Sequence, residues 1–284
     1  MDEMKILIAG LPNAGKTTYI AALNGAIQTG GDFSLSYAGK SSEVQYINKI
    51  TRQWLEGKIV EHSTDEDPKY IDWPLKRKND DVITITIPDM KGEMYQDIIN
   101  NDFNEGLAEF CKGSSGVLFF INDIVKPVLK EHARNIVSGN ESNSGQRNQA
   151  NASAISLTID KVNDVVKAIL VLKYLRKLIG DIKLVVVVSS WDEIEASYDS
   201  IDNYMQKQCS ALYNYVRYHF SDYRFYGVSA QGLKYDSHTG SLDKITTDGK
   251  RAYVYTTEKN YDLSIPLEYL LGEQDENPSD TSRL

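Results

Sequence analysis

One short stretch near the start of the chain has residue types and a spacing that fit phosphate binding. Residues 10–17 read GLPNAGKT, which matches the pattern GxxxxGK[ST], and they follow the apolar run of residues 5–9. In this setting the backbone N–H groups of the loop can wrap phosphate groups, with the N-terminus of a helix behind them. Lys16 is placed to reach the β- and γ-phosphates, and the Thr17 hydroxyl to bind Mg²⁺. The sequence therefore predicts a nucleotide phosphate site, with the candidate binding residues Gly10, Asn13, Ala14, Gly15, Lys16, Thr17 and Thr18.

Composition narrows the kinds of protein that this chain can be. Its 284 residues are 41% hydrophobic, which is enough for a sizeable core. The net charge of −9 and the pI near 5.0 argue against a broad nucleic-acid-binding face. Cys111 and Cys209 lie far apart without a CxxC motif, so they predict reduced thiols. No apolar run is long enough to span a membrane, and the start lacks a basic signal region, so we expect a cytoplasmic protein with no nucleic-acid and no membrane partner.

Strand-like and helix-like segments alternate along most of the chain. Runs rich in apolar or β-branched residues predict strands, and apolar residues three and four positions apart predict helices. This alternation indicates one α/β domain over residues 1–272, with a mostly parallel sheet. The predicted strands are residues 5–9, 69–78, 82–87, 116–121, 182–188 and 224–228, and the predicted helices are residues 18–23, 41–57, 95–110, 158–179, 200–220 and 264–272.

Two pairs of segments predict antiparallel pairing. Residues 69–78 and 82–87 flank a turn-forming Asn-Asp-Asp cluster, which predicts a hairpin and hence one antiparallel strand at the edge of the sheet. Residues 242–245 and 253–255 flank an Asp-Gly pair, which predicts a small peripheral hairpin.

Three further segments interrupt the regular pattern. The helix over residues 41–57 is an insertion in the expected fold. Residues 134–153 are rich in Asn, Ser, Gly and Gln without an apolar period, which predicts a polar loop inside the domain. Residues 273–284 predict a disordered tail.

Other candidate site residues follow the ends of later predicted strands. Parallel strands present their carboxyl ends at one edge of a sheet, where α/β proteins bind ligands. Asp89 directly follows one such strand, from where a carboxylate can hold Mg²⁺ through water, and Gly92 can offer its N–H to a γ-phosphate. A turn residue at the end of a strand is the plain alternative for Asp89, and the phosphate loop upstream favours the metal-binding interpretation. Asp192 and Ser229 follow two later strands.

These motifs, in this order, resemble those of the TRAFAC class of GTPases, the Ras-like and Era-like proteins, over almost the whole chain. The residues that carry the resemblance are the phosphate loop, Asp89 with Gly92, Asp192 in the place of the aspartate of the [NT]KxD motif, and the Ser229-Ala230 pair. The resemblance implies a Ras-like fold with helices on both faces of the sheet, and GTP or GDP as the ligand. It also implies that Asp192 accepts hydrogen bonds from guanine N1 and the 2-amino group, while the Ala230 N–H meets guanine O6. Adenine lacks both of those donors, so the aspartate would reject it.

The sequence departs from the family pattern at three positions. Ser189 and Ser190 replace the usual Asn/Thr-Lys pair, so the lysine that normally covers the base is missing. Trp191 is a candidate to cover part of that surface, and the alternative is a core residue. Glu93 stands where many relatives carry the glutamine that positions the attacking water. Its carboxylate brings negative charge toward a γ-phosphate, so we expect slow intrinsic hydrolysis.

Two smaller features bear on metal ions. The loop spelling around Asn13 resembles the Era-like branch, in which an asparagine here is associated with a bound K⁺ that substitutes for an arginine finger. The alternative is that Asn13 only tolerates the unusual backbone of the loop. The first switch segment must supply a hydroxyl to Mg²⁺, and we select Thr64 rather than Ser63, in the acidic loop before the strand at residues 69–78.

A second, looser resemblance concerns the prokaryotic double-GTPase families that are predicted to work in bacterial conflict systems. It rests on the helical insertion, the polar loop at residues 134–153 and the terminal residues 266–271. It implies a component of an antiphage system that switches its contacts with partner proteins encoded beside it. The expected function is thus Mg²⁺-dependent GTP binding with slow hydrolysis. Two alternatives remain, a P-loop ATPase or kinase, and a scaffold that holds its nucleotide without hydrolysing it.

Overall fold

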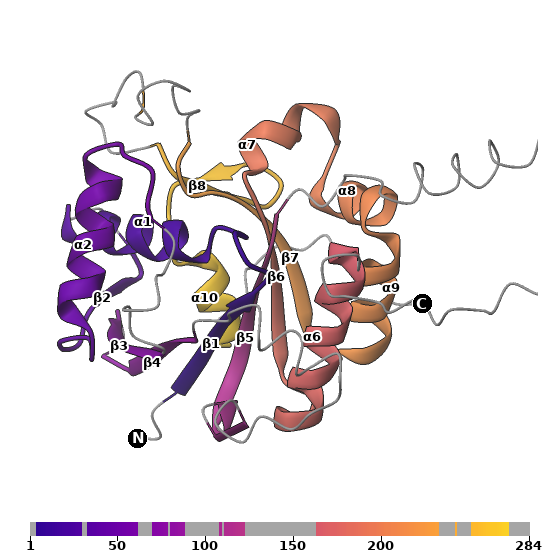
Figure 1. Ribbon diagram of the computed structural model, residues 1–284, viewed down its shortest axis with the longest axis horizontal. Coiled ribbons are helices and arrows are strands. Elements are labelled where there is room, and N and C mark those ends of the chain that lie inside the picture. Colours follow the sequence, from indigo (N-terminus) through magenta and orange to yellow (C-terminus); the bar gives the residue numbers. More distant parts are fainter. Residues whose placement is uncertain are drawn as a thin grey trace, which may run out of the picture.

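The computed structural model describes residues 4–29, 33–61, 70–78, 80–88, 108–109, 111–122, 163–232, 242 and 251–272. These residues form a nine-stranded sheet, shown in Figure 1. Across the sheet, the strands lie in the order β2 (Leu35–Tyr37), β3 (Tyr70–Arg77), β4 (Val82–Pro88), β1 (Met4–Gly10), β5 (Ser114–Ile121), β6 (Lys183–Ser189), β7 (Tyr223–Ser229), β8 (Tyr253–Tyr255) and β9 (Lys259–Asn260).

The five central strands, β4, β1, β5, β6 and β7, are parallel to one another. β1, β5 and β6 contain nearly continuous apolar runs, as expected for strands that are covered on both faces, whereas β4 alternates Ile with Thr. Leu118, for example, lies between Ile8 and Val185 in the sheet, and all three side chains are fully buried. The predicted α/β fold with a mostly parallel sheet is therefore confirmed.

Antiparallel pairing occurs at both ends of the sheet. The predicted hairpin of β3 and β4 is present, but β3 is not the edge strand, because the short β2 pairs with its outer side. At the other end, β8 is antiparallel to β7 and β9 is antiparallel to β8. The expectation of one antiparallel edge strand was therefore too simple. The expected pairing of residues 253–255 with residues 242–245 was also wrong as far as the structure extends, since Leu242 instead donates its N–H to the Gly57 carbonyl at 2.9 Å.

Helices cover both faces of this sheet, as the resemblance implied. In Figure 1, α1, α2 and α10 lie on one side, and α6, α8 and α9 lie on the other. The α-helices described are α1 (Lys16–Gln28), α2 (Val44–Leu55), α6 (Asp164–Ile179), α7 (Trp191–Ile194), α8 (Ile201–Gln208), α9 (Ser210–His219) and α10 (Ile265–Leu270), with a 3-10 turn at Glu195–Ser197. The single helix expected over residues 200–220 is split into α8 and α9 at Cys209, whose φ of −120° and ψ of 33° are not helical.

Helix α2 packs closely against α1. A Cβ atom on Gly25 would lie 2.8 Å from the Trp54 ring, so the missing side chain lets the two helices approach. Beside this contact, the buried Asn24 amide donates to the Thr51 hydroxyl at 2.8 Å. Because buried polar groups require partners, this bond fixes how α2 is placed on α1.

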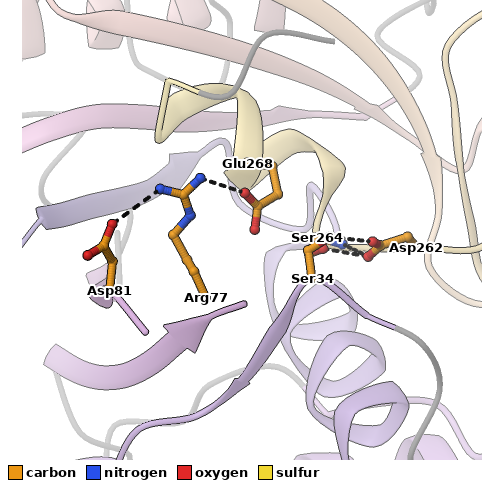
Figure 2. Close-up of polar contacts among 6 residues, drawn as sticks. All are labelled: Ser34, Arg77, Asp81, Asp262, Ser264 and Glu268. Carbon is orange, nitrogen blue, oxygen red and sulfur yellow. Dashed lines mark hydrogen bonds and ion pairs between the residues drawn. The ribbon is translucent and has the colours of Figure 1, made fainter. Parts of the chain in front are cut away.

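Polar contacts tie the segment that leads into α10, and α10 itself, to the end of the sheet formed by β2 and β3 (Figure 2). Asp262 accepts hydrogen bonds from the Ser264 N–H at 2.8 Å and from the Ser34 hydroxyl at 3.2 Å. Arg77 is 6% exposed, and its guanidinium lies 3.3 Å from Glu268 on α10 and 3.8 Å from Asp81. Removing one partner of such a buried pair is costly, because the other charge stays buried.

Several expectations lie outside the described residues. These are most of the predicted helix at residues 95–110, the loop at residues 134–153 and the tail at residues 273–284. Cys111 and Cys209 are both buried and are not in disulfides, and burial raises the pKa of the Cys111 thiol to about 12. Among the helices described, none combines the length and the apolar composition needed to cross a membrane.

Candidate functional site

The predicted phosphate loop joins the carboxyl end of β1 to the start of α1. At its first residue, Gly10, φ is +146°, and a Cβ atom would lie 2.3 Å from the Phe120 carbonyl oxygen of β5. Only glycine fits so close to another backbone. The next residue, Leu11, donates its N–H to the same Phe120 oxygen at 3.2 Å. The neighbouring strand therefore fixes the entrance of the loop.

The far end of the loop turns into the helix through left-handed backbone. Asn13 has a φ of 59° and Gly15 a φ of 82°. The first helical hydrogen bond runs from the Tyr19 N–H to the Gly15 carbonyl at 2.9 Å, so the amide groups before Tyr19 lie outside the helical ladder. Such a helix start favours anions. Asparagine is one of the residues that tolerate left-handed backbone, so the loop conformation by itself is compatible with Asn13 whether or not it also binds an ion.

Lys16 lies over the loop that it belongs to. Its ammonium group donates to the Gly10 carbonyl at 3.0 Å and to the Leu11 carbonyl at 2.8 Å. The side chain is partly buried and thus held at the loop. A phosphate bound in the loop would meet a positive charge that is already in place.

The end of β6 is tied to the phosphate loop by a side chain. The buried Ser189 hydroxyl donates to the Ala14 carbonyl at 2.5 Å. A Cβ atom on Gly15 would lie 3.0 Å from the same hydroxyl oxygen, so loop and strand are in close contact. Ser189 stands where relatives carry Asn or Thr, and here it joins the two segments.

Trp191 belongs to the core rather than to the base-covering surface. Its side chain is fully buried, and its ring lies 5.8 Å from Tyr204 and 5.6 Å from Tyr255 between ring centroids. A Cβ atom on Gly227 would lie 2.4 Å from the Trp191 ring, so β7 leaves room for the indole. Ser190 before it adopts left-handed backbone with a φ of 53°. The core interpretation of Trp191 is therefore confirmed.

Asp192 and Ser229 meet at the ends of neighbouring strands. Because β6 and β7 are parallel and paired, both residues lie at the carboxyl edge of the sheet. The Ser229 hydroxyl donates to Asp192 Oδ1 at 2.5 Å and accepts from the Gly232 N–H at 3.0 Å. A carboxylate has about four acceptor positions, so this bond leaves Asp192 capacity for further donors. The structure thus brings together two of the predicted base-reading residues.

The loop of residues 229–232 has neighbours that the sequence analysis missed. The Trp54 indole N–H donates to the Ala230 carbonyl at 2.8 Å, and the Arg251 guanidinium lies 3.8 Å from the centroid of the Trp54 ring. The side-chain nitrogen and oxygen of Gln231 are buried and have no hydrogen-bond partner among the residues described. An unpaired buried amide is costly, so a bound polar group at this loop would relieve it.

Three charged or ionisable groups lie beside Ser229 and Asp192. The Tyr253 hydroxyl donates to Glu195 at 3.0 Å, and the Lys259 ammonium lies 2.6 Å from the same carboxylate. Burial, the hydrogen bond to Glu195 and the negative charges of Glu195 and Asp192 all raise the pKa of Tyr253. Tyr253 therefore stays a neutral hydrogen-bond donor near this end of the site.

The family comparison matches nearly the whole of this arrangement. The model of the family Double-GTPase 1 matches residues 7–270, which include the phosphate loop, Asp192 and the 229–232 loop. The chain belongs to the Double-GTPase 1 family. The looser of the two sequence resemblances is therefore confirmed. A search among curated proteins finds no match.

Membership of Double-GTPase 1 is consistent with a P-loop GTPase of the bacterial conflict-system type, and the family name implies GTP binding. The local geometry fits a bound anion such as phosphate, because a loop with left-handed glycine backbone lies at a helix start. Near the other end of the site, the buried Gln231 amide has no hydrogen-bond partner among the residues described, so a bound polar group could pair with it.

Several predicted catalytic and metal residues of this Double-GTPase 1 member lie outside the described part of the chain, namely Thr64, Asp89, Gly92 and Glu93. Thr17 is described at the start of α1 and is partly exposed. Within the described ranges, no three His, Cys, Asp or Glu side chains gather as a metal site. The metal assignments therefore stay predictions.

A cavity of about 230 Å³ lies elsewhere, between α1, β2 and α2. It is lined by residues of the second half of α1 and the start of α2, among them Asn24, Gln28, Val44 and Asn48, and by Trp73 of β3. No motif in the sequence pointed to it, because its walls come from three separate segments. It includes no residue of the phosphate loop.

Proposed function

We propose that this member of the Double-GTPase 1 family binds Mg²⁺–GTP, hydrolyses it slowly and uses the bound nucleotide to control contacts with partner proteins. The observation that carries the proposal is the pair of hydrogen bonds that joins the strand ends, Ser189 to Ala14 and Ser229 to Asp192. Ser189 and Asp192 lie three positions apart, so one short segment touches the phosphate loop and carries the proposed base-reading carboxylate.

In this proposal the phosphates lie in the loop of residues 10–16. The amide groups at the start of α1 donate to them, and Lys16 exchanges its contacts with the Gly10 and Leu11 carbonyls for phosphate oxygens. Since Lys16 is already held at the loop, little side-chain entropy is lost when it changes partners. The loop residues Ala14, Gly15, Thr17 and Thr18 complete this set.

The guanine base lies against Asp192 and Ala230. Asp192 accepts hydrogen bonds from N1–H and the 2-amino group, and the bond from Ser229 orients its carboxylate. The Ala230 N–H donates to O6. Adenine would leave Asp192 facing an acceptor at N1, so GTP is selected over ATP. This is the reason to prefer a GTPase over a P-loop ATPase or kinase.

Thr17, Thr64 and Asp89 are the residues that would hold Mg²⁺. The ion neutralises charge on the phosphates when it is bound. Gly92 would offer its N–H to the γ-phosphate, so that the segments around Thr64 and Gly92 respond to the nucleotide state. The changed segments would in turn bind or release partner proteins encoded by neighbouring genes of an antiphage defence system.

Slow hydrolysis is proposed because Glu93 replaces the usual water-positioning glutamine. Its carboxylate can orient a water molecule, but its charge opposes the approach to a γ-phosphate. Asn13 is proposed as a ligand of K⁺, whose positive charge would partly offset the slow hydrolysis caused by Glu93. Turnover should then be faster in KCl than in NaCl, and equal rates in the two salts would exclude the K⁺ site.

The decisive experiment compares GTP, ATP and XTP binding for the natural chain and for Asp192→Asn. The natural chain should prefer GTP, and Asp192→Asn should lose roughly 10- to 100-fold in GTP affinity, because hydrogen bonds to a charged group are lost. The variant should gain affinity for XTP, since an amide N–H can donate to the 2-carbonyl of xanthine.

Asp199→Asn is the matched control, because it removes an exposed carboxylate a few residues away. It should leave all three affinities unchanged. Tighter ATP than GTP binding by the natural chain, or an unchanged GTP to XTP ratio in Asp192→Asn, would overturn the proposal. Stoichiometric bound GTP without any turnover would favour the scaffold alternative.

A further inference from the structure

Trp54 links helix α2 to the loop that follows β7. It lies at the end of α2, is only 4% exposed, and its indole N–H donates to the Ala230 carbonyl at 2.8 Å. The two residues are 176 positions apart in the chain. A buried tryptophan usually gives its N–H a partner, but here that partner is the backbone of one of the residues proposed to read the base.

The indole is held in place from two sides. A Cβ atom on Gly25 would lie 2.8 Å from the ring, so α1 is in contact with one side. The Arg251 guanidinium lies 3.8 Å from the ring centroid, and it also donates a hydrogen bond to the Trp54 carbonyl. Cation–π contact and packing together restrict the ring, so the direction of its N–H is fixed.

The loop itself is restrained on both sides of Ala230. Ser229 before it bonds to Asp192, and Gly232 after it has a φ of +75°. A Cβ atom on Gly232 would lie 1.7 Å from the Arg251 carbonyl oxygen, so the loop passes directly against that backbone. Between these restraints, the bond from Trp54 fixes the direction of the Ala230 carbonyl. Because the backbone of Ala230 is restrained on both sides, this also fixes the direction of its N–H.

We infer that Trp54 is a positioning residue of the base site. By holding the Ala230 carbonyl, it directs the Ala230 N–H toward O6 of guanine, and it makes helix α2 part of the nucleotide site. This inference rests on the proposed function, because it needs guanine to lie against Ala230. It gives the helix inserted at residues 41–57 a role in the nucleotide site.

A packing role alone for Trp54 predicts a different result, and nucleotides with altered bases separate the two. IDP keeps O6 and N1–H but lacks the 2-amino group. The 5′-diphosphate of 2-aminopurine riboside keeps the 2-amino group but lacks both O6 and N1–H, so its base binds without any contact to the Ala230 N–H. Only a nucleotide with O6 can report the direction of the Ala230 N–H.

The test measures the affinity of the full chain for GDP, IDP and the 2-aminopurine nucleotide, with and without Trp54→Phe. Phenylalanine keeps a ring between Gly25 and Arg251 but has no N–H. The variant should bind GDP and IDP roughly 3- to 10-fold more weakly, as expected for one neutral hydrogen bond, with an unchanged ratio between the two. Its affinity for the 2-aminopurine nucleotide should stay the same.

Trp73→Phe serves as the matched control, since it shortens another buried tryptophan, in β3. It should change none of the three affinities. An equal loss for all three nucleotides in Trp54→Phe, or no loss for any of them, would overturn the inference. If the natural chain does not prefer GDP over the 2-aminopurine nucleotide, the proposed function itself fails instead.

Gly25→Ala provides a second route if Trp54→Phe does not fold. The added methyl group would lie 2.8 Å from the Trp54 ring and must displace it, while alanine itself favours the helix. The indole N–H is kept but moved away from Ala230. The same selective loss for GDP and IDP is expected, and an equal loss or no loss would again contradict the inference.

Discussion

At the phosphate end of the site, residues 10–16 shape the loop with their own backbone, whereas at the base end the loop of residues 229–232 is shaped by side chains from distant segments. The phosphate loop depends on Gly10 and Gly15, whose backbone angles other residues adopt at a cost. The base loop depends on Trp54 and Asp192, which reach it from α2 and α7.

This difference predicts how substitutions at each end of the site should change nucleotide binding. A backbone cradle binds phosphate whatever base is attached, so its substitutions should affect GTP and ATP alike. A cradle made by side chains reads one edge of one base, so its substitutions should change selectivity. The two ends are in contact through the hydrogen bond from Ser189 to Ala14. A substitution there should therefore affect both phosphate binding and base selectivity.

The largest effect on binding is expected from Lys16→Ala at the phosphate end. It removes the ammonium group that is held over the loop. Because hydrogen bonds to charged groups contribute about 1.5–3 kcal/mol each, nucleotide affinity should fall on the order of 100-fold or more. GDP and IDP should lose equally, which isothermal titration can measure. Lys173→Ala on the exposed face of α6 should bind as the natural chain does, and a loss confined to one base would contradict the division between the two ends.

The next effect concerns folding stability at the entrance of the phosphate loop. Gly10→Ala would place a methyl group 2.3 Å from the Phe120 carbonyl oxygen, at a φ of +146°. Strain and steric overlap together should lower the free energy of unfolding by roughly 2–5 kcal/mol in urea titrations.

Gly113→Ala separates these two causes. Gly113 also has a positive φ, +78°, but a Cβ atom there would meet nothing within 4 Å. Gly113→Ala should lower the free energy of unfolding by only about 1–2 kcal/mol, because only the positive φ is unfavourable for alanine there. Equal costs for the two variants would mean that the contact with β5 does not shape the loop.

The strands that carry the site could be predicted because their signal is local. Each of the five central strands is rich in apolar or β-branched residues, and each predicted strand lies within about two residues of the observed one. The positions of Asp192 and Ser229 follow from that alone, since neighbouring parallel strands end at the same edge.

The short outer strands gave no comparable signal. β2 has three residues and β9 has two, which is too few for a periodic pattern. Their pairing is decided by the neighbouring strand. For the same reason the partner of residues 253–255 was wrong, because a turn-forming pair in the sequence marks a turn but does not say which strand follows it.

The base end could not be predicted for a different physical reason. The bond from Trp54 to Ala230 and the contact of Arg251 with Trp54 join segments that are far apart in the chain. Nothing in the residues around Trp54 distinguishes it from any apolar position on the buried side of an amphipathic helix. Gly25 shows the same limit, because it lies inside α1, which continues to Gln28, whereas the predicted helix ended at residue 23.

The smallest effect is expected where the two ends meet. Ser189→Ala removes the hydroxyl that donates to the Ala14 carbonyl and leaves that buried oxygen without this donor. The free energy of unfolding should fall by about 1–2 kcal/mol, as for a buried hydrogen bond that loses one partner. Because the bond sets the distance between the phosphate loop and the segment with Asp192, the affinities for GDP and IDP should both fall a few-fold.

Ser36→Ala is the control for this last change, because Ser36 donates to the Lys76 carbonyl at 3.4 Å on an exposed strand. Its cost should stay within about 0.5 kcal/mol, as for surface substitutions in general. If Ser189→Ala weakened phosphate binding but left the GDP to ADP affinity ratio unchanged, Ser189 would belong to the phosphate end alone. A fall in that ratio as well would mean that the bond also positions Asp192, so that one hydroxyl group keeps the two differently built ends in register.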